Sequence, residues 1–204
     1  MPKVAIVDLH GTASNTAIPA LSSHVAAAQG EIEIFDGING RLPRARKFDA
    51  YLLSGGPLAP DAQQPWRVRL QAATPEWTRS RPVFAIGLGF EVMAAAHGWA
   101  VRPLDTPRNG IYPITPSPAG WNDPVMVDLE NATPVFEQRS WAVLPPPAAT
   151  RSKAVVLAYT SAGDVGVARF GPNAVGTIFH PEAKTAGTAT TVLARFLMGA
   201  LGNT

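Results

Sequence analysis

The sequence predicts an α/β fold in which a mostly parallel central sheet is flanked by helices and extended by an antiparallel section. Two patterns lead to this prediction. In residues 1–98, short apolar runs alternate with segments of helical periodicity, which is typical of parallel strands joined by right-handed crossovers. From Trp99 onward, prolines are frequent and short alternating segments follow one another, which favours antiparallel strands. The 204 residues are enough for one domain, 1–204, with a substantial core.

The first half is predicted to alternate strands with helices. The strands are short apolar or alternating runs, and the helices carry apolar residues at spacings of three and four. Gly30 and Gly98 mark helix ends, and Pro75 is expected to interrupt the second helix. The expected strands are Val4–Leu9, Glu31–Phe35, Asp49–Leu53 and Val83–Ile86, and the expected helices are Asn15–Gln29, Pro65–Ser80 and Gly89–His97.

The second half is predicted to consist mainly of strands and to close with one helix. The run Pro145-Pro146-Pro147 favours a polyproline II turn over a helix. The closing helix, Thr188–Leu201, has an apolar face that is expected to pack inward. The expected strands are Gly110–Ile114, Val125–Asp128, Trp141–Leu144, Ala154–Thr160, Val165–Phe170 and Ala174–Phe179.

Composition excludes several classes of function. There is no cysteine, which excludes disulfides, thiolate metal sites and cysteine catalysis, and nothing points to another metal or to a cofactor. The formal net charge is only +2, and the basic cluster Arg41–Lys47 is interpreted as a solvated loop, so no nucleic-acid partner is expected. No segment has the length of a membrane span and no signal peptide is evident, so we expect a cytoplasmic protein without membrane contact.

Two motifs at predicted strand ends carry the strongest functional signal. The stretch Pro82–Glu91 predicts an apolar strand, a sharp turn at Gly87-Leu88-Gly89 and the start of a helix. This is the shape of a nucleophile elbow, which exposes one side chain on a strained turn between a strand and a helix. Near the end of the chain, Gly176–Glu182 predicts a strand that ends in His180, with Glu182 two residues further on.

This pair of motifs resembles the signature of the class I glutamine amidotransferases, in which the elbow reads G-x-C-x-G-x-Q and a later segment reads F-H-P-E. Aligned on that signature, the family's cysteine falls on Gly87 and its glutamine falls on Glu91. The base and its orienting acid are present as His180 and Glu182. The resemblance covers nearly the whole chain and implies a flavodoxin-like α/β fold with the nucleophile replaced.

Two further segments fit the same family in the correct order. Ser54-Gly55-Gly56-Pro57 resembles the family's S-G-G-P loop, which helps to form the oxyanion hole, and Leu144-Pro145 resembles its L-P step before the late strands. The resemblance therefore places Gly55, Gly56 and Leu88 in an oxyanion and substrate-binding site, together with Glu91.

Glutamine hydrolysis in this family needs an atom that position 87 lacks. A thiolate attacks the side-chain amide while a histidine moves the proton, and Val83–Gly98 contains no Ser, Thr, Cys, Lys or Tyr that could substitute. A carboxylate at Glu91 could repel a substrate carboxylate, bind a cation, or favour the imidazolium form of His180. We therefore expect no glutaminase activity, and we expect His180 to lie beside Gly87 and to contact Glu182.

Three functions are compatible with this pattern. The leading one is a catalytically degenerate amidotransferase-like protein that serves as a binding, structural or regulatory subunit, with a synthase-type protein partner or a second copy of itself. The second is an enzyme with altered hydrolase or transferase chemistry, in which His180 and Glu182 activate a water. The third is a sensor that binds a small molecule in the remnant glutamine pocket through Glu91.

Overall fold

The computed structural model describes residues 1–11, 15–60, 63–147 and 154–202. In these ranges the strands form one sheet with the order β2-β1-β3-β4-β9-β8-β7-β5-β6. The strands are β1 (Lys3–Asp8), β2 (Glu31–Asp36), β3 (Ala50–Leu53), β4 (Val83–Ile86), β5 (Ala100–Pro116), β6 (Thr133–Leu144), β7 (Ala154–Thr160), β8 (Val165–Phe170) and β9 (Ala174–Thr177). The helices are α1 (Ala17–Ala27), α2 (Pro65–Ser80), α3 (Leu88–Ala96) and α4 (Thr190–Leu201), with short 3-10 turns η1 (Gly120–Asn122) and η2 (Gly187–Ala189).

The sheet is parallel in one half and antiparallel in the other, which confirms the predicted fold class. Strands β2, β1, β3, β4 and β9 run parallel, whereas β8, β7, β5 and β6 add on in antiparallel pairs. Strands β3, β4 and β9 are buried along their whole length. Continuous apolar runs of this kind suit parallel strands that are covered on both faces.

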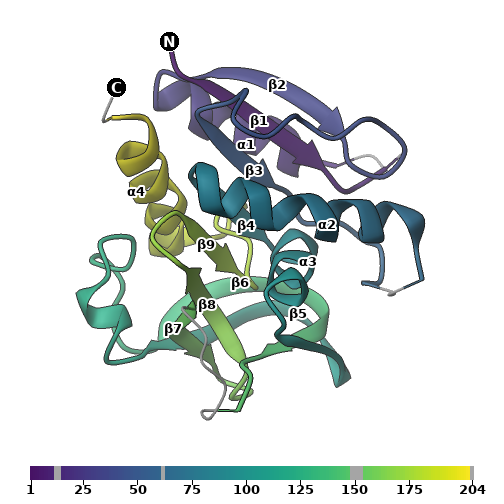
Figure 1. Ribbon diagram of the computed structural model, residues 1–204. Coiled ribbons are helices and arrows are strands. Elements are labelled where there is room, and N and C mark those ends of the chain that lie inside the picture. Colours follow the sequence, from purple (N-terminus) through teal and green to yellow (C-terminus); the bar gives the residue numbers. More distant parts are fainter. Residues whose placement is uncertain (12–14, 61–62, 148–153, 203–204) are drawn as a thin grey trace.

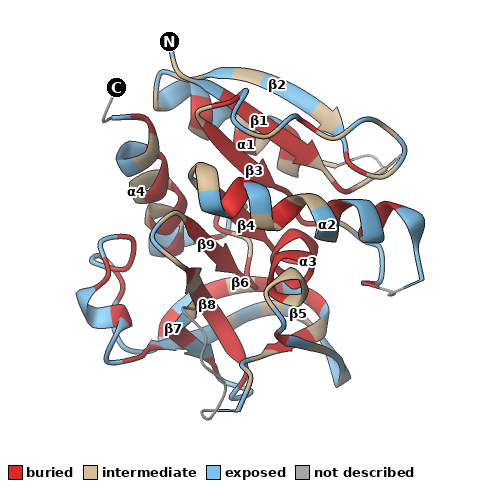
Figure 2. Ribbon diagram, viewed as in Figure 1, coloured by how far each residue is buried: buried red, intermediate tan, exposed pale blue. Residues whose placement is uncertain are grey.

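Two pairs of helices cover the two faces of the parallel half. Helices α1 and α4 pack together on one face, and α2 and α3 pack together on the other (Figure 1). The buried strands between them form the red centre of Figure 2, and exposed residues gather on the outer sides of the helices and on edge strand β2. The core is therefore divided by the sheet into two apolar layers.

No helix in the described ranges combines the length and apolar character that crossing a bilayer requires.

Two helix predictions needed correction. Pro75 lies inside α2 without interrupting it, and the Thr74 hydroxyl one residue earlier donates to the Leu70 carbonyl at 2.7 Å. Helix α1 ends before Gln29, which itself takes a left-handed conformation (φ 59°), so the reversal expected at Gly30 occurs one residue earlier. By contrast, Gly98 (φ 80°) follows α3 as predicted.

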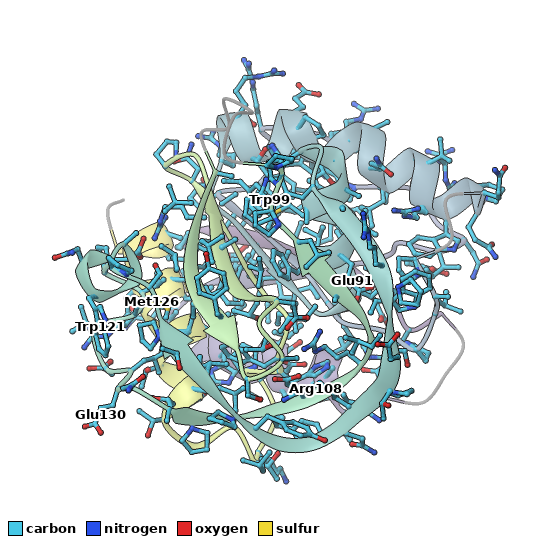
Figure 3. The ribbon with its side chains drawn as sticks, turned by 90° about the horizontal axis from the view of Figure 1, so that it is seen from below. Glu91, Trp99, Arg108, Trp121, Met126 and Glu130 are labelled. Atoms are coloured by element: carbon cyan, nitrogen blue, oxygen red, sulfur yellow. The ribbon has the colours of Figure 1, made fainter. Side chains whose placement is uncertain are left out.

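The predicted strand Val125–Asp128 is wrong. This segment forms turns, because the Asp123 carboxylate accepts the Val125 N–H at 3.1 Å and the Asp123 carbonyl accepts the Met126 N–H at 2.9 Å. The apolar side chains of Val125 and Met126 pack into the core from these turns, so their burial gave a strand-like pattern. Figure 3 shows Met126 in this segment, on the opposite side of the molecule from Glu91.

Three other strands have a boundary that differs from the prediction by two residues or more. The segment predicted at Gly110–Ile114 belongs to the longer strand β5, and that predicted at Trp141–Leu144 is the end of β6. The last strand, β9, ends at Thr177 instead of Phe179. The long β5–β6 pair has a register shift between Pro103 and Arg108, and such an irregularity hides the strand periodicity in the sequence.

Candidate functional site

Four chain segments meet at one edge of the sheet because their strands are parallel. Strands β1, β3, β4 and β9 are neighbours, and Ile86 of β4 pairs with Thr177 of β9. The residues that follow these strands therefore emerge at the same carboxyl-terminal edge, where open α/β sheets bind their ligands. The segments that meet there begin at Leu9, Ser54, Gly87 and Ile178.

Gly87 forms the sharp turn between β4 and α3. Its backbone has φ 48° and ψ −115°, a conformation that side chains with a Cβ rarely adopt. Its N–H donates to the Thr177 carbonyl at 2.8 Å, and its carbonyl accepts the Glu91 N–H at 2.9 Å. The predicted elbow therefore joins the end of the sheet to the first turn of the helix, which begins at Leu88, one residue before the predicted start.

His180 lies directly over Gly87. A Cβ placed on Gly87 would stand 3.5 Å from Cε1 and 3.6 Å from Nε2 of the His180 ring. On its other side, the ring meets Glu182, with 2.8 Å between Nδ1 and Oε1. The backbone N–H of His180 donates to the Phe136 carbonyl at 3.0 Å, which holds this segment against β6. The structure thus brings together the three residues that the motifs predicted to converge.

The surroundings of the His180 ring shift its pKa in opposing directions. Burial alone would lower the pKa of His180. The Glu182 hydrogen bond and charge, a backbone hydrogen bond with Gln138, and the charge of Glu91 together outweigh it and raise the pKa above its usual value. The imidazolium form is therefore favoured in this site.

The glycines of the loop after β3 allow very close packing at the same edge. A Cβ on Gly55 would stand 2.8 Å from Cε1 of His180, and a Cβ on Gly56 would stand 2.2 Å from the Leu9 carbonyl oxygen. The preceding Ser54 fixes the loop, because its hydroxyl accepts the Leu9 N–H at 2.9 Å. Gly55 and Gly56 are therefore required by space alone, whatever part they take in binding.

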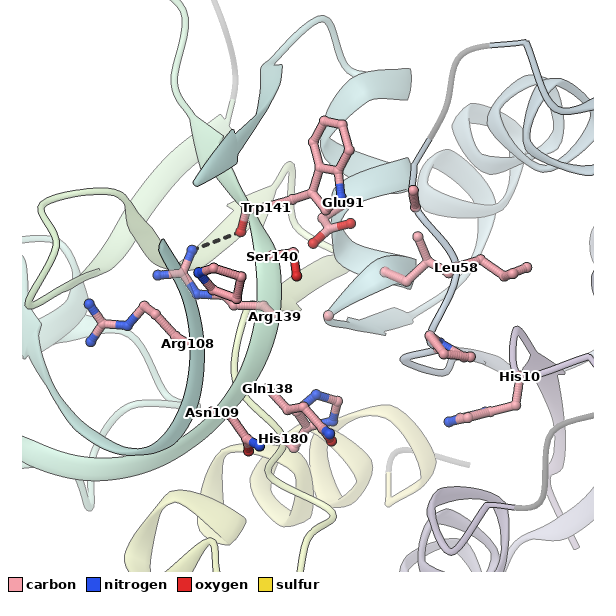
Figure 4. A pocket seen from close by; sticks show the side chains of 16 residues that line it. His10, Leu58, Glu91, Arg108, Asn109, Gln138, Arg139, Ser140, Trp141 and His180 are labelled. Atoms are coloured by element: carbon pink, nitrogen blue, oxygen red, sulfur yellow. Dashed lines mark hydrogen bonds between the residues drawn. The ribbon is translucent and has the colours of Figure 1, made fainter. Parts of the chain in front are cut away.

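A cavity of about 540 Å³ opens above Gly87 and His180. It has the size of a small-molecule site. Figure 4 shows His10 and Arg108 on opposite walls and the Glu91 carboxylate between them. The lining residues are His10, Gly56, Pro57, Leu58, Ala59, Gly87, Leu88, Glu91, Pro107, Arg108, Asn109, Gln138, Arg139, Ser140, Trp141 and His180.

Glu91 lies in the first turn of α3 and is 4% exposed. Burial raises its pKa from 4.5 to about 7, although the charges of Arg139, Arg67 and His180 act in the opposite direction. In the described part of the chain, no side chain donates a hydrogen bond to the Glu91 carboxylate, and its link to His180 is one of charge. The predicted proximity of Glu91 to the pocket is thus observed, without a direct His180 pair.

Sequence reasoning missed an ionic network behind the cavity wall. Arg139 on β6 contacts the fully buried Glu137 at 2.7 Å and also pairs with Asp164. Arg108 on β5 reaches the same Glu137 oxygen at 2.7 Å, and its guanidinium lies 3.8 Å from the ring centre of Tyr112. The signal in the sequence was the alternation of Glu137 and Arg139, in the part of β6 that precedes the predicted segment Trp141–Leu144.

A second histidine–carboxylate pair was also missed. His10 Nδ1 lies 2.8 Å from the Asp8 carboxylate at the end of β1, and His10 lines the cavity. Ser140 lines it too, but no hydrogen bond joins its hydroxyl to His180. In the described residues, no three His, Cys, Asp or Glu side chains are grouped so that they could hold a metal ion.

The family model of the class-I glutamine amidotransferases matches residues 21–200. The chain belongs to this family. Its fold is similar to a glutamine amidotransferase from Thermotoga maritima (TM-score 0.81, 14% identity, 98% of each chain covered). It is also similar to a protein provisionally assigned as a GMP synthase subunit from Thermoplasma acidophilum (TM-score 0.79, 15% identity, 100% of this chain and 95% of that one).

A third similar fold is that of a glutamine amidotransferase from Methylobacillus flagellatus (TM-score 0.72, 17% identity, 90% of this chain and 70% of that one). No curated protein sequence matches the chain. At these identities the solved structures show that this chain has the family fold. The chemistry of its site must be argued from its own residues.

Proposed function

We propose that this protein is a catalytically degenerate member of the amidotransferase family that acts as a binding or regulatory subunit. One observation carries the proposal. At the elbow, the position from which a side chain would face His180 Nε2 at 3.6 Å is occupied by Gly87, which has no reacting atom. In this proposal Gly87 stands where the family has its cysteine, and His180 and Glu182 are the remaining base and orienting acid.

The state of His180 supports the loss of hydrolysis over a change of chemistry. A water in place of the missing thiol would need a neutral imidazole that can accept its proton. Here the neighbours of His180 raise its pKa, because Glu182, the backbone of Gln138 and the charge of Glu91 all favour the protonated ring. A ring whose pKa is raised is free to accept a proton over a smaller part of the pH range, so the alternative enzyme is the weaker hypothesis.

The proposed subunit role is supported by the structural features of the site that are still formed. The elbow, the glycine loop and the cavity are all formed, and a fold neighbour carries the name of a synthase subunit. A protein that lost its nucleophile while keeping this surface could still dock on a synthase-type partner or on a second copy of itself. Gly56 and Leu88 would then line the remnant pocket, and Gly55 would leave room for the His180 ring, instead of forming an oxyanion hole.

An ammonia-release assay with glutamine tests the proposal. We expect the purified protein to release no more ammonia than buffer does, because the chain contains no thiol. The His180→Ala variant serves as the matched control, since it removes the general base and keeps the elbow. Release above the buffer rate that disappears in His180→Ala would overturn the proposal and favour an activated water.

A further inference from the structure

Glu91 is the one acid of the cavity wall that the described part of the chain leaves without a hydrogen-bonding partner. It is 96% buried, since only 4% of its surface is exposed, and its carboxylate points into the cavity (Figure 4). Burial of this side chain disfavours its charged form, and no hydrogen bond from the described residues offsets that cost. Such a group calls for a donor that the protein itself does not supply.

The basic side chains around the cavity are already committed to other acids. Arg67 on α2 acts on Glu91 through its charge but does not line the cavity. The basic residues that do line it each meet their own carboxylate: Arg108 and Arg139 at Glu137, Arg139 also at Asp164, His180 at Glu182, and His10 at Asp8. Among the charged side chains that line the cavity, Glu91 is therefore the one that forms no ion pair within the described residues.

An anion would be a poor occupant of this cavity. The amino-terminal end of α3 would by itself attract one, but Glu91 in the first turn already provides the negative charge there. A second anion near Glu91 would be repelled, whereas a cation with N–H groups would supply both the missing charge and the missing donors. The indole of Trp141 lines the same cavity, and an aromatic wall is favourable for an ammonium ion.

We propose that the cavity binds a small primary amine as its ammonium ion, with Glu91 accepting hydrogen bonds from the ammonium group and Trp141 forming part of the wall. This inference rests on the proposed function, because it assigns the remnant pocket to a ligand. A volume of about 540 Å³ leaves room for a compact aliphatic amine.

The test is a titration of the isotope-labelled protein followed by NMR, with n-butylammonium chloride as the probe. Butan-1-ol and sodium butyrate serve as neutral and anionic probes of similar size. We expect n-butylammonium to bind more tightly than either, and Glu91→Gln to weaken its binding about tenfold or more, as the loss of a charge-assisted hydrogen bond does. Equal binding to Glu91→Gln, or tighter binding of butyrate, would overturn the proposal.

Two further variants keep the result interpretable. Glu76→Gln makes the same charge change at an exposed site on α2 and should leave the affinity unchanged. Trp141→Leu should weaken n-butylammonium binding and leave the folded spectrum intact, since the Arg139 bond at this position goes to the Trp141 backbone carbonyl. If Glu76→Gln weakened the binding as much as Glu91→Gln does, the binding would depend only on the net charge of the protein, and the proposed site would be refuted.

The affinity should also depend on pH in a defined direction. Between pH 6 and pH 8, Glu91 loses its proton while the amine keeps its own, so binding should strengthen about tenfold in this range. Any positive charge that His180 loses as the pH rises acts in the same direction, so the measure is the part of the dependence that Glu91→Gln removes. A pH profile that is identical in Glu91→Gln would contradict the proposal.

The amine titration and the ammonia assay test different claims, so the failure of one can be distinguished from the failure of the other. Failure of n-butylammonium to bind would remove the ligand class and leave the loss of glutaminase activity standing. Ammonia release from glutamine would overturn the degenerate function, whatever the probe does.

Discussion

At the scale of single residues, the glycine at position 87 determines both the backbone conformation of the turn and the absence of a nucleophile. Its φ of 48° with ψ of −115° is strained for any residue with a Cβ. In a nucleophile elbow, the nucleophilic residue adopts a strained conformation of this kind. Glycine relieves the strain and removes the nucleophile in the same step. There is still space for a side chain, because the contacts of a Cβ here are ordinary, at 3.5 Å or more.

Gly87→Cys should therefore fold, with a loss of about 1–3 kcal/mol in the free energy of unfolding because of its backbone conformation. We expect this single variant to release little ammonia from glutamine, because Glu91 still places a carboxylate where the family has an amide. The double variant Gly87→Cys with Glu91→Gln should release more than the sum of the single variants, because both positions act on one bound glutamine.

The measurement is ammonia release at matched protein concentrations, with Gly87→Ala as the control that shares the backbone strain and lacks the thiol. Full activity of Gly87→Cys alone would mean that Glu91 has no effect on glutamine binding. An inert double variant would show that the pocket has changed beyond these two positions.

At the scale of elements, the site follows from the order of the strands. Parallel pairing of β4 with β9 is enough to bring Gly87 and His180 to the same edge, although 92 residues separate them in the sequence. The sequence allowed this convergence to be predicted because both motifs are short, local and adjacent to apolar strands. The network of Arg139, Glu137 and Asp164 could not be predicted, because it depends on the register of long antiparallel strands with bulges.

The contact between α3 and β9 is tight enough to require glycine. A Cβ on Gly176 would stand 2.0 Å from Cδ2 of Phe90, in a layer where both residues are buried. Gly176→Ala should therefore lower the free energy of unfolding by about 1–3 kcal/mol through overpacking, as measured by urea denaturation. Combining it with Phe90→Leu should recover part of this loss relative to the sum of the two single changes.

Gly199 in α4 provides the matched control for this prediction. Its Cβ would meet nothing within 4 Å, so Gly199→Ala should raise the free energy of unfolding by about 0.5–1 kcal/mol through helix propensity. Destabilisation by Gly199→Ala, or no effect of Gly176→Ala, would contradict the assigned packing of the two faces.

At the scale of the whole molecule, the buried charges make stability depend on pH. Glu91 has a pKa of about 7 in the folded protein, raised by burial from 4.5 in an exposed chain. Between these values the folded state holds a proton that the unfolded state has released, so the free energy of unfolding falls as the pH rises. For His180, whose pKa is also raised in the folded state, the stabilisation is present below pH 6.5 and is lost as the pH rises through the folded value.

Replacing Glu91 by glutamine should remove its share of this dependence. The gain in the free energy of unfolding from Glu91→Gln should be larger at pH 8 than at pH 4.5, by an amount on the order of 3 kcal/mol at most, because each pKa unit corresponds to about 1.4 kcal/mol. Urea denaturation of both proteins at pH 4.5, 6 and 8 measures it, and Glu76→Gln, which changes an exposed acid, should follow the wild type at every pH. The decline that persists in Glu91→Gln above pH 6.5 belongs to His180 and should disappear in a double variant that also carries His180→Gln. If Glu91→Gln and the wild type instead lose stability in parallel from pH 4.5 to pH 8, Glu91 is already ionised in the folded protein at low pH, and the burial of an unpaired acid in this cavity is not the source of the pH dependence.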